Sequence, residues 1–269
     1  MEPMTFETPS DLLVKINIAS GTIRLDAADT TTTQVLVERV KDPKNLVVRL
    51  DPDAGGGHRL SIEQKGGKFG FSSGKDLVIA IRCPLGTRLE MASGSADLTS
   101  HGRLGGIDFR SGSGDVEFDD VDGAVSVKVG SGDLVGGAVG GDLTMNSASG
   151  DVRIASVGGT LSARSASGDM DVDAVDGSVT VTSVSGDVRL GSLLQGTTNI
   201  RSVSGDVEIG VAAGTKVFLD VRAASGDARS DLTSMDGQSG EGRPLELKVL
   251  TVSGDIRIRR APARTPVHA

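Results

Sequence analysis

A series of aspartates at nearly constant spacing provides the residues of this sequence that are best placed to do chemistry. Each closes a Ser-Gly-Asp triplet or, in the first case, a related Gly-Ser-Ala-Asp. The series consists of Asp97, Asp115, Asp133, Asp151, Asp169, Asp187, Asp206, Asp227 and Asp255. The first six are 18 residues apart, and the last three follow at 19, 21 and 28 residues. Such carboxylates could bind a cation, or they could be turn residues whose oxygens accept backbone hydrogen bonds.

Calcium is the cation that this pattern most resembles a site for, because nine-residue repeats also build calcium-bound β-rolls. Those turns have the pattern G-G-x-G-x-D-x-U-x, whereas each triplet here has one glycine and no second acidic position at a fixed offset. Calcium needs six to eight oxygen ligands. We therefore expect no calcium, no other metal and no cofactor, and we interpret the aspartates as a structural turn ladder that faces solvent or is hydrogen-bonded to backbone N–H groups.

Other catalytic patterns are also missing from the sequence. The glycine-rich segment 66–75 lacks the G-x-x-x-x-G-K-[ST] of a phosphate-binding loop, since Asp76 follows its last lysine. Acyltransferases with hexapeptide repeats would need apolar residues at offsets 1, 7 and 13, but after Asp115 these are Val116, Asp122 and Lys128. No Ser-His-Asp or Cys-His set has a recognisable spacing. We expect a protein that is not an enzyme.

The elements that position the aspartates are predicted by the apolar residues between them. After each aspartate these recur at offsets 1, 3, 6, 10, 12 and 15, so that each repeat consists of two nine-residue halves. After Asp169 they are Met170, Val172, Val175, Val179, Val181 and Val184. Two apolar residues that are two positions apart point to one face of a strand. The third is expected at the corner, where glycine supplies a tight turn.

A nine-residue half cannot bury its own apolar side, so the copies must stack. The sequence predicts an all-β fold: a single-chain parallel β-solenoid (β-helix) of about 18 residues per coil, with strands ~4.8 Å apart and irregular coils at both ends. An array of β-hairpins does not fit, because its offsets would mirror one another instead of repeating.

Four regions follow from where the period begins and ends. Residues 1–92 are predicted to form irregular coils that cap the same solenoid, with a separate small β-sandwich as the alternative. Residues 93–227 contain the regular repeats, 228–260 a loop and a final coil or cap, and 261–269 a flexible tail.

Composition narrows the classes of partner. The formal net charge is −8, aromatic residues make up 2%, and there is no Trp or Tyr, which argues against nucleic acid as a partner. The single cysteine, Cys83, cannot form an intramolecular disulfide. The N-terminus has neither a basic start nor an apolar run typical of a signal peptide, and no stretch reaches the ~18 apolar residues of a spanning helix. We expect a cytoplasmic location without membrane insertion.

Candidate interaction residues lie where the period breaks. Phe69 and Phe71 belong to the glycine-rich segment and could cap the solenoid or contact a partner. Arg257, Arg259 and Arg260 form a basic group on an acidic chain. They could protect the final edge strand or contact the acidic body of another molecule.

The phrase from Val78 to Leu89 (Val-Ile-Ala-Ile-Arg-Cys-Pro-Leu-Gly-Thr-Arg-Leu), followed by repeated Ser-Gly-Asp-Val, resembles a known family. This is the bacterial "putative adhesin" β-strand-repeat family, the domain of unknown function 4097, and the resemblance covers about residues 12–258. It implies a β-solenoid from a bacterium, and it supplies no catalytic residues.

We therefore expect a non-enzymatic β-solenoid that serves as a scaffold or protein-interaction module, whose partner is an unidentified protein or a second copy of itself. The alternative is a self-assembling filament protein of the cytoskeletal type, because an uncovered terminal coil is a template for another strand. A more remote alternative is a carbohydrate-active β-helix enzyme.

Overall fold

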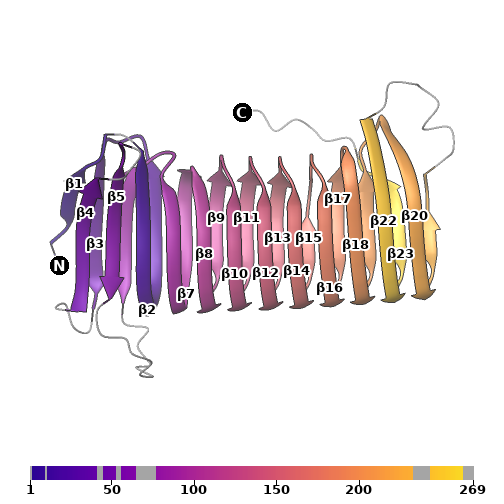
Figure 1. Ribbon diagram of the computed structural model, residues 1–269, viewed down its shortest axis with the longest axis horizontal. Coiled ribbons are helices and arrows are strands. Elements are labelled where there is room, and N and C mark those ends of the chain that lie inside the picture. Colours follow the sequence, from indigo (N-terminus) through magenta and orange to yellow (C-terminus); the bar gives the residue numbers. More distant parts are fainter. Residues whose placement is uncertain are drawn as a thin grey trace.

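The computed structural model describes residues 2–9, 11–40, 45–52, 56–64, 77–232 and 243–262. These residues form one 23-stranded sheet that is wound into a long coil with two walls (Figure 1). Most neighbouring strands are parallel, so the predicted all-β parallel solenoid is confirmed. In the part of the chain that the structure describes, no helix has the length and apolar character needed to span a membrane.

The first wall contains twelve strands or parts of strands, in this spatial order. They are β4 (Leu46–Pro52), β5 (His58–Gln64), the first half of β2 (Leu12–Ala28), the first half of β7 (Arg88–Leu104), β8 (Gly106–Ser113), β10 (Val125–Ser131), β12 (Leu143–Ser149), β14 (Leu161–Ser167), β16 (Val179–Ser185), β18 (Gly196–Ser204), β22 (Arg243–Ser253) and β20 (Thr215–Ser225).

The second wall lies behind the first and continues each coil after its Ser-Gly-Asp corner. Its strands are β1 (Met4–Glu7), β3 (Thr32–Arg39), β6 (Val78–Pro84), the second halves of β2 and β7, β9 (Val116–Val121), β11 (Leu134–Val139), β13 (Val152–Val157), β15 (Met170–Val172), β17 (Val188–Leu193), β19 (Val207–Val211), β23 (Ile256–Arg260) and β21 (Ala228–Ser230).

The 18-residue period becomes vertical register in the stack. Leu161 on β14 pairs with Leu143 on one side and with Val179 on the other, each 18 residues away. Because side chains alternate along a strand, every inward position then forms a column of apolar side chains that runs the length of the solenoid. The core is this set of columns, enclosed between the two walls.

The two halves of a repeat differ at their third apolar position. Val175, at the corner of the second wall, is buried, but Val184 in the first wall is 51% exposed. Strand β16 continues its strict alternation and places Ser183 inward instead, and the Ser183 hydroxyl donates a hydrogen bond to the Ser185 carbonyl. That bond satisfies the hydroxyl, so the inward corner of the first wall accepts serine and the valine lies on the surface.

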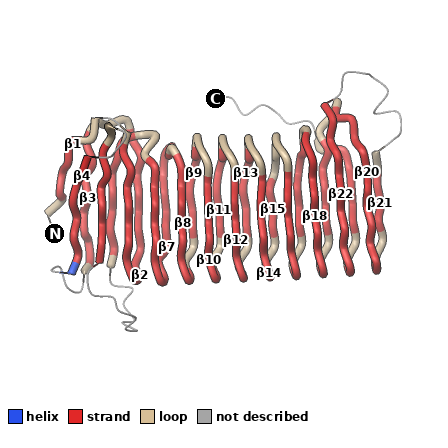
Figure 2. Tube along the Cα trace, in the orientation of Figure 1, coloured by secondary structure: helices blue, strands red, loops and turns tan. Residues whose placement is uncertain are grey.

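The coils do not all stack in sequence order. The coil of β22 and β23 lies between those of β18/β19 and β20/β21, which both precede it in the chain (Figure 2). The sequence order had placed residues 243–260 last. The inward side chains explain the exchange, because Ile256 and Ile258 pair with Ala228 and Ser230 on the outermost coil. The more apolar coil is thus covered on both sides.

A similar exchange occurs at the other end. The coil made by β2 lies between β7 and the later pair β5/β6. Beyond that pair, β4 pairs antiparallel with β5, β3 pairs antiparallel with β6, and β1 pairs antiparallel with β3. The two ends of the solenoid therefore present different edge strands.

Close stacking at the Ser-Gly-Asp corner depends on glycine. Gly168 has φ +119°, and a Cβ there would overlap the carbonyl oxygen of Gly150 on the coil before it. Gly214 also has a positive φ, +75°, but no atom lies within 4 Å of the place that its Cβ would occupy. The pair separates the cost of the backbone angle from the cost of the close approach.

We predict that Gly168→Ala lowers the free energy of unfolding by about 3 kcal/mol or more, because strain and overlap add. Gly214→Ala should cost about 1–2 kcal/mol, from the backbone angle alone. Urea unfolding followed by circular dichroism measures both. Equal losses in the two variants would show that close stacking at the corner contributes nothing of its own.

Candidate functional site

The aspartate ladder is continuous along the whole stack. In each step the backbone N–H of one aspartate donates to Oδ1 of the aspartate on the neighbouring coil, as from Asp187 to Asp169 at 2.9 Å. The steps from Asp97 to Asp206 follow the sequence. Beyond Asp206 the ladder passes through Asp255 at 2.8 Å and ends at Asp227 at 2.9 Å, in the spatial order of the coils.

These carboxylates face solvent and have backbone partners at the same time. Neighbouring carboxylates one rung apart repel by about 1 kcal/mol in water, and a hydrogen bond contributes a similar amount in the opposite direction. Among the described residues, no group of three or more His, Cys, Asp or Glu side chains is placed to hold a metal ion. The ladder therefore acts as corner structure.

The arginine group predicted from the sequence lies on β23, which pairs with β19 on one side and β21 on the other. It is therefore not at a free edge, in contrast to what its place near the end of the chain suggested. Arg259 forms an ion pair with Glu208 at 2.8 Å, and Arg260 donates to the Ala212 carbonyl at 2.9 Å. Arg257 is exposed on the outer surface of the second wall.

Two further sequence candidates offer no chemistry here. Phe69 and Phe71 lie outside the described residues. Cys83 is fully buried, and burial raises the pKa of its thiol to about 11. A buried, protonated thiol is a poor nucleophile.

A surface that the sequence analysis did not single out lies on the first wall, over the five consecutive strands β10, β12, β14, β16 and β18. We call it the basic face. These strands contain no aspartate or glutamate, although the chain has a formal net charge of −8. Their cationic residues are Lys128, Arg164 and Arg201, all exposed. None of the three forms an ion pair or a side-chain hydrogen bond with any described residue.

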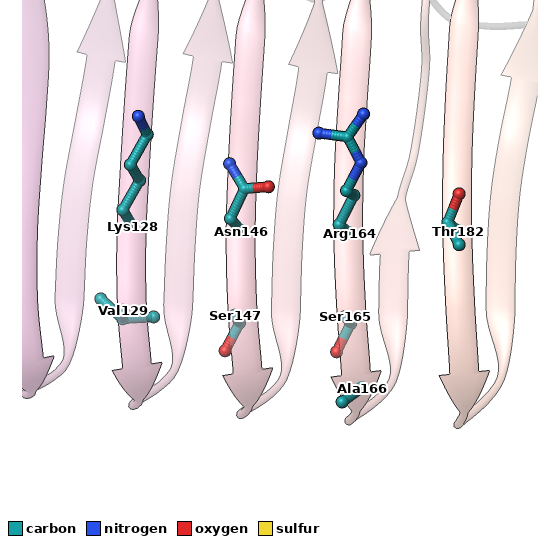
Figure 3. Close-up of a pocket in the computed structure, with 8 residues that line it drawn as sticks. All are labelled: Lys128, Val129, Asn146, Ser147, Arg164, Ser165, Ala166 and Thr182. Atoms are coloured by element: carbon teal, nitrogen blue, oxygen red, sulfur yellow. The ribbon is translucent and has the colours of Figure 1, made fainter.

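The cations occupy one straight row along the solenoid axis. Lys128 pairs in register with Asn146, Asn146 with Arg164, Arg164 with Thr182, and Thr182 with Arg201. Figure 3 shows the first four of these side chains in line across neighbouring parallel strands. Several of them line an open, shallow groove of about 520 Å³.

Two other rows border this central row. Two residues before each member lies a small polar residue, and two residues after it lies a small or apolar one. The polar row is Ser126, Thr144, Ser162, Thr180 and Asn199; the small row is Gly130, Ala148, Ala166, Val184 and Val203. A partner can therefore approach the central row closely from one side and form hydrogen bonds on the other.

Most cations of the second wall have partners. Arg189 lies 3.2 Å from Asp171, and Arg153 lies 3.3 Å from Asp151. Exposed pairs of this kind contribute little to stability, but they neutralise local charge. The two walls therefore differ: the second has mixed, mostly paired charges, and the first has a row of unpaired positive charge.

The sequence contained a signal for this row. Lys128 and Arg164 each lie 13 residues after a ladder aspartate, and Arg201 lies 14 after Asp187, where the repeat is one residue longer. Comparison of outward offsets between repeats, instead of inward ones, would have found it.

Comparisons with known proteins agree with this architecture. The family model described as Toastrack DUF4097 matches residues 13–259. Among solved structures, a "putative adhesin" from Bacteroides fragilis NCTC 9343 is 13% identical with a TM-score of 0.43, covering 95% of each chain. A "putative lipid binding protein" from Parabacteroides distasonis ATCC 8503 is 15% identical with a TM-score of 0.41, covering 97% of each. No curated protein matches this chain.

The ladder's role is tested at Asp169, which forms no ion pair within the described residues. We predict that Asp169→Ala lowers the free energy of unfolding by about 1 kcal/mol, because the Asp187 N–H loses its acceptor. Asp169→Asn keeps an oxygen in place and removes one of three adjacent charges, so its stability should lie within about 0.5 kcal/mol of wild type. Thermal unfolding decides, and equal loss in both variants would assign the effect to charge instead of the hydrogen bond.

Proposed function

This chain belongs to the Toastrack DUF4097 family, and we propose that it is a non-enzymatic, adhesin-like scaffold that binds a macromolecular partner along its basic face. The observation that supports the proposal most directly is the contrast between the walls. Lys128, Arg164 and Arg201 are unpaired on one wall, whereas most cations of the other wall are in ion pairs. Unpaired cations of one sign on a broad, open surface favour recognition of an anionic partner.

The chemistry of the remaining polar residues supports a binding role over catalysis. The ladder carboxylates hold the corners of the coils, and each neighbours another carboxylate and a backbone N–H instead of a base or nucleophile. The Cys83 thiol is buried within the core. The groove beside the basic face is open, while catalytic sites usually lie in enclosed clefts that exclude water.

The test compares three variants that keep the outer shape of the solenoid. The face variant is Lys128→Gln/Arg164→Gln/Arg201→Gln. The wall variant, Arg153→Gln/Arg189→Gln/Arg257→Gln, makes the same change in net charge on the opposite wall. The loop variant, Phe69→Ser/Phe71→Ser, tests the segment that the sequence analysis favoured.

Each protein is immobilised and exposed to an extract of the source cells, and the retained macromolecules are compared. We predict that the face variant loses at least about tenfold of the specifically retained material, whereas the wall variant retains it. Melting temperatures near that of wild type confirm folding. Full retention by the face variant would exclude this surface, and loss confined to the loop variant would move the site to residues 69–71.

A second candidate, association of two copies, is favoured by the outermost coil. Strand β20 pairs with β22 on one side and with no described strand on the other. Phe218 is 55% exposed and Leu219, which is in register with the buried Leu247, is 44% exposed. An unpaired strand edge with apolar side chains is a template for pairing. Since the opposite end has antiparallel edge strands, contact between two β20 edges would give a dimer and not a filament.

We predict that wild type shows a concentration-dependent monomer–dimer equilibrium in sedimentation velocity, and that Leu219→Lys shifts it to monomer because a charge would be buried at the contact. Lys248→Ala, on the outer surface of the neighbouring strand, is the matched control. A wild type that stays monomeric at high concentration excludes end-to-end contact, and species larger than a dimer would favour the filament.

A further inference from the structure

The central row of the basic face alternates in charge with a period of two rungs. Lys128, Arg164 and Arg201 are positive, and the residues between them, Asn146 and Thr182, are neutral. With parallel strands ~4.8 Å apart, successive positive charges are roughly 10 Å apart along a line parallel to the solenoid axis. A partner that complements this row has negative charges at about the same interval.

Acidic corners border the basic face on both long sides. The aspartate ladder follows the ends of the five strands, and Asp122, Asp142 and Asp176 lie in the corners before their starts. Asp142 is exposed, and its Oδ1 accepts a hydrogen bond from the Thr160 N–H at 2.7 Å. An anionic partner is therefore attracted to the central row and repelled from both rims.

The rims determine which shape of partner fits. An anionic membrane or a broad acidic protein surface would contact the rims together with the central row, and its charges would be opposed by two lines of carboxylates. A narrow, linear polyanion that lies along the row contacts the cations and avoids the rims. The charge pattern therefore favours a polymer that is one chain wide.

The flanking rows determine the chemistry of that polymer. The polar row offers one hydroxyl or amide at every rung, as in Thr144, Ser162 and Thr180. Sugars of an extended polysaccharide advance by roughly one rung each and carry hydroxyl groups that suit these partners. Single-stranded nucleic acid relies on aromatic stacking, and the five strands contain no aromatic residue. An extended peptide repeats the side chains of one face every ~6.7 Å, which does not match the row.

We infer that the basic face binds a linear acidic polysaccharide in which every second sugar is negatively charged, such as an alternating uronate polymer. The chain lies parallel to the solenoid axis, with carboxylates at Lys128, Arg164 and Arg201 and neutral sugars at Asn146 and Thr182. The small row, which includes Ala148 and Ala166, allows the sugar rings to approach the wall. This inference rests on the proposed function, since it specifies the partner of the same surface.

The test uses the full chain and defined probes. Hyaluronan has one carboxylate per two sugars, polygalacturonate has one per sugar, and dextran is neutral. Binding is measured by titration calorimetry at low salt. We expect wild type to bind hyaluronan and not dextran, with affinity that falls as salt is raised. The face variant should weaken hyaluronan binding by at least about tenfold, and the wall variant should leave it unchanged.

A gain of charge tests the alternation itself. Asn146→Lys/Thr182→Lys places a cation on every rung of the row, and both positions point outward. This variant should improve binding of polygalacturonate at least about fivefold more than binding of hyaluronan, because only the former has charges that meet the new lysines. Equal improvement for both polymers would show that total charge matters and spacing does not, and would overturn the inference.

Vesicles of phosphatidylserine and phosphatidylcholine and a single-stranded oligonucleotide are the rival probes. Failure to bind hyaluronan, or equal binding by wild type and the face variant, overturns the polysaccharide. If the face variant still loses its partners in cell extract, and vesicles or oligonucleotide bind wild type through the same three cations, the proposed function stands with a different ligand. If the face variant retains every partner in extract, the proposed function fails with the inference.

Discussion

The close stacking of one Ser-Gly-Asp corner on the next is the constraint on which the rest of this structure depends. Glycine leaves room for the carbonyl of the neighbouring coil, and aspartate accepts that coil's N–H. Together they fix the distance between coils and their rotation about the axis. Once both are fixed, residues 18 positions apart occupy equivalent places, so a column in the aligned repeats becomes a line of side chains in space. The apolar core and the outer rows are both consequences of this registration.

The fold was largely predictable because the determining interactions are local and repeated. Alternating apolar residues such as Val179 and Val181, together with a glycine corner, permit few structures other than a stacked parallel coil. The corner of the first wall was less predictable: the sequence suggested that Val184 belongs with the core-forming positions. Strand alternation instead buries Ser183, whose hydroxyl is satisfied by the Ser185 carbonyl, and exposes the valine. A composition-based pattern cannot foresee that choice, because it depends on a hydrogen bond within the turn.

The order of the end coils and the candidate site were not predicted, for different physical reasons. Coil order is a competition between alternative stacks, decided by which inward side chains lose most from exposure; Ile256 and Ile258 outweigh Ala228 and Ser230. The basic face was missed because attention went to inward positions and to breaks in the period. Its cations lie on outward positions in the most regular part of the chain. In a solenoid, regularity does not exclude a binding surface, since it is what aligns single side chains from separate repeats into one row.

The single irregularity within the basic face supports this view. The repeat between Asp187 and Asp206 is one residue longer than those before it, and an extra residue in a strand would move every later side chain to the opposite face. The register shift instead lies in the second wall, between Leu190 and Leu193 of β17. Strand β18 consequently enters the first wall in register, with Arg201 opposite Thr182. The extra residue is absorbed where charges are mixed and mostly paired, and the straight row on the other wall is preserved. A surface whose only role was solvation would have no need of that alignment, whereas a surface that binds a linear polymer depends on it.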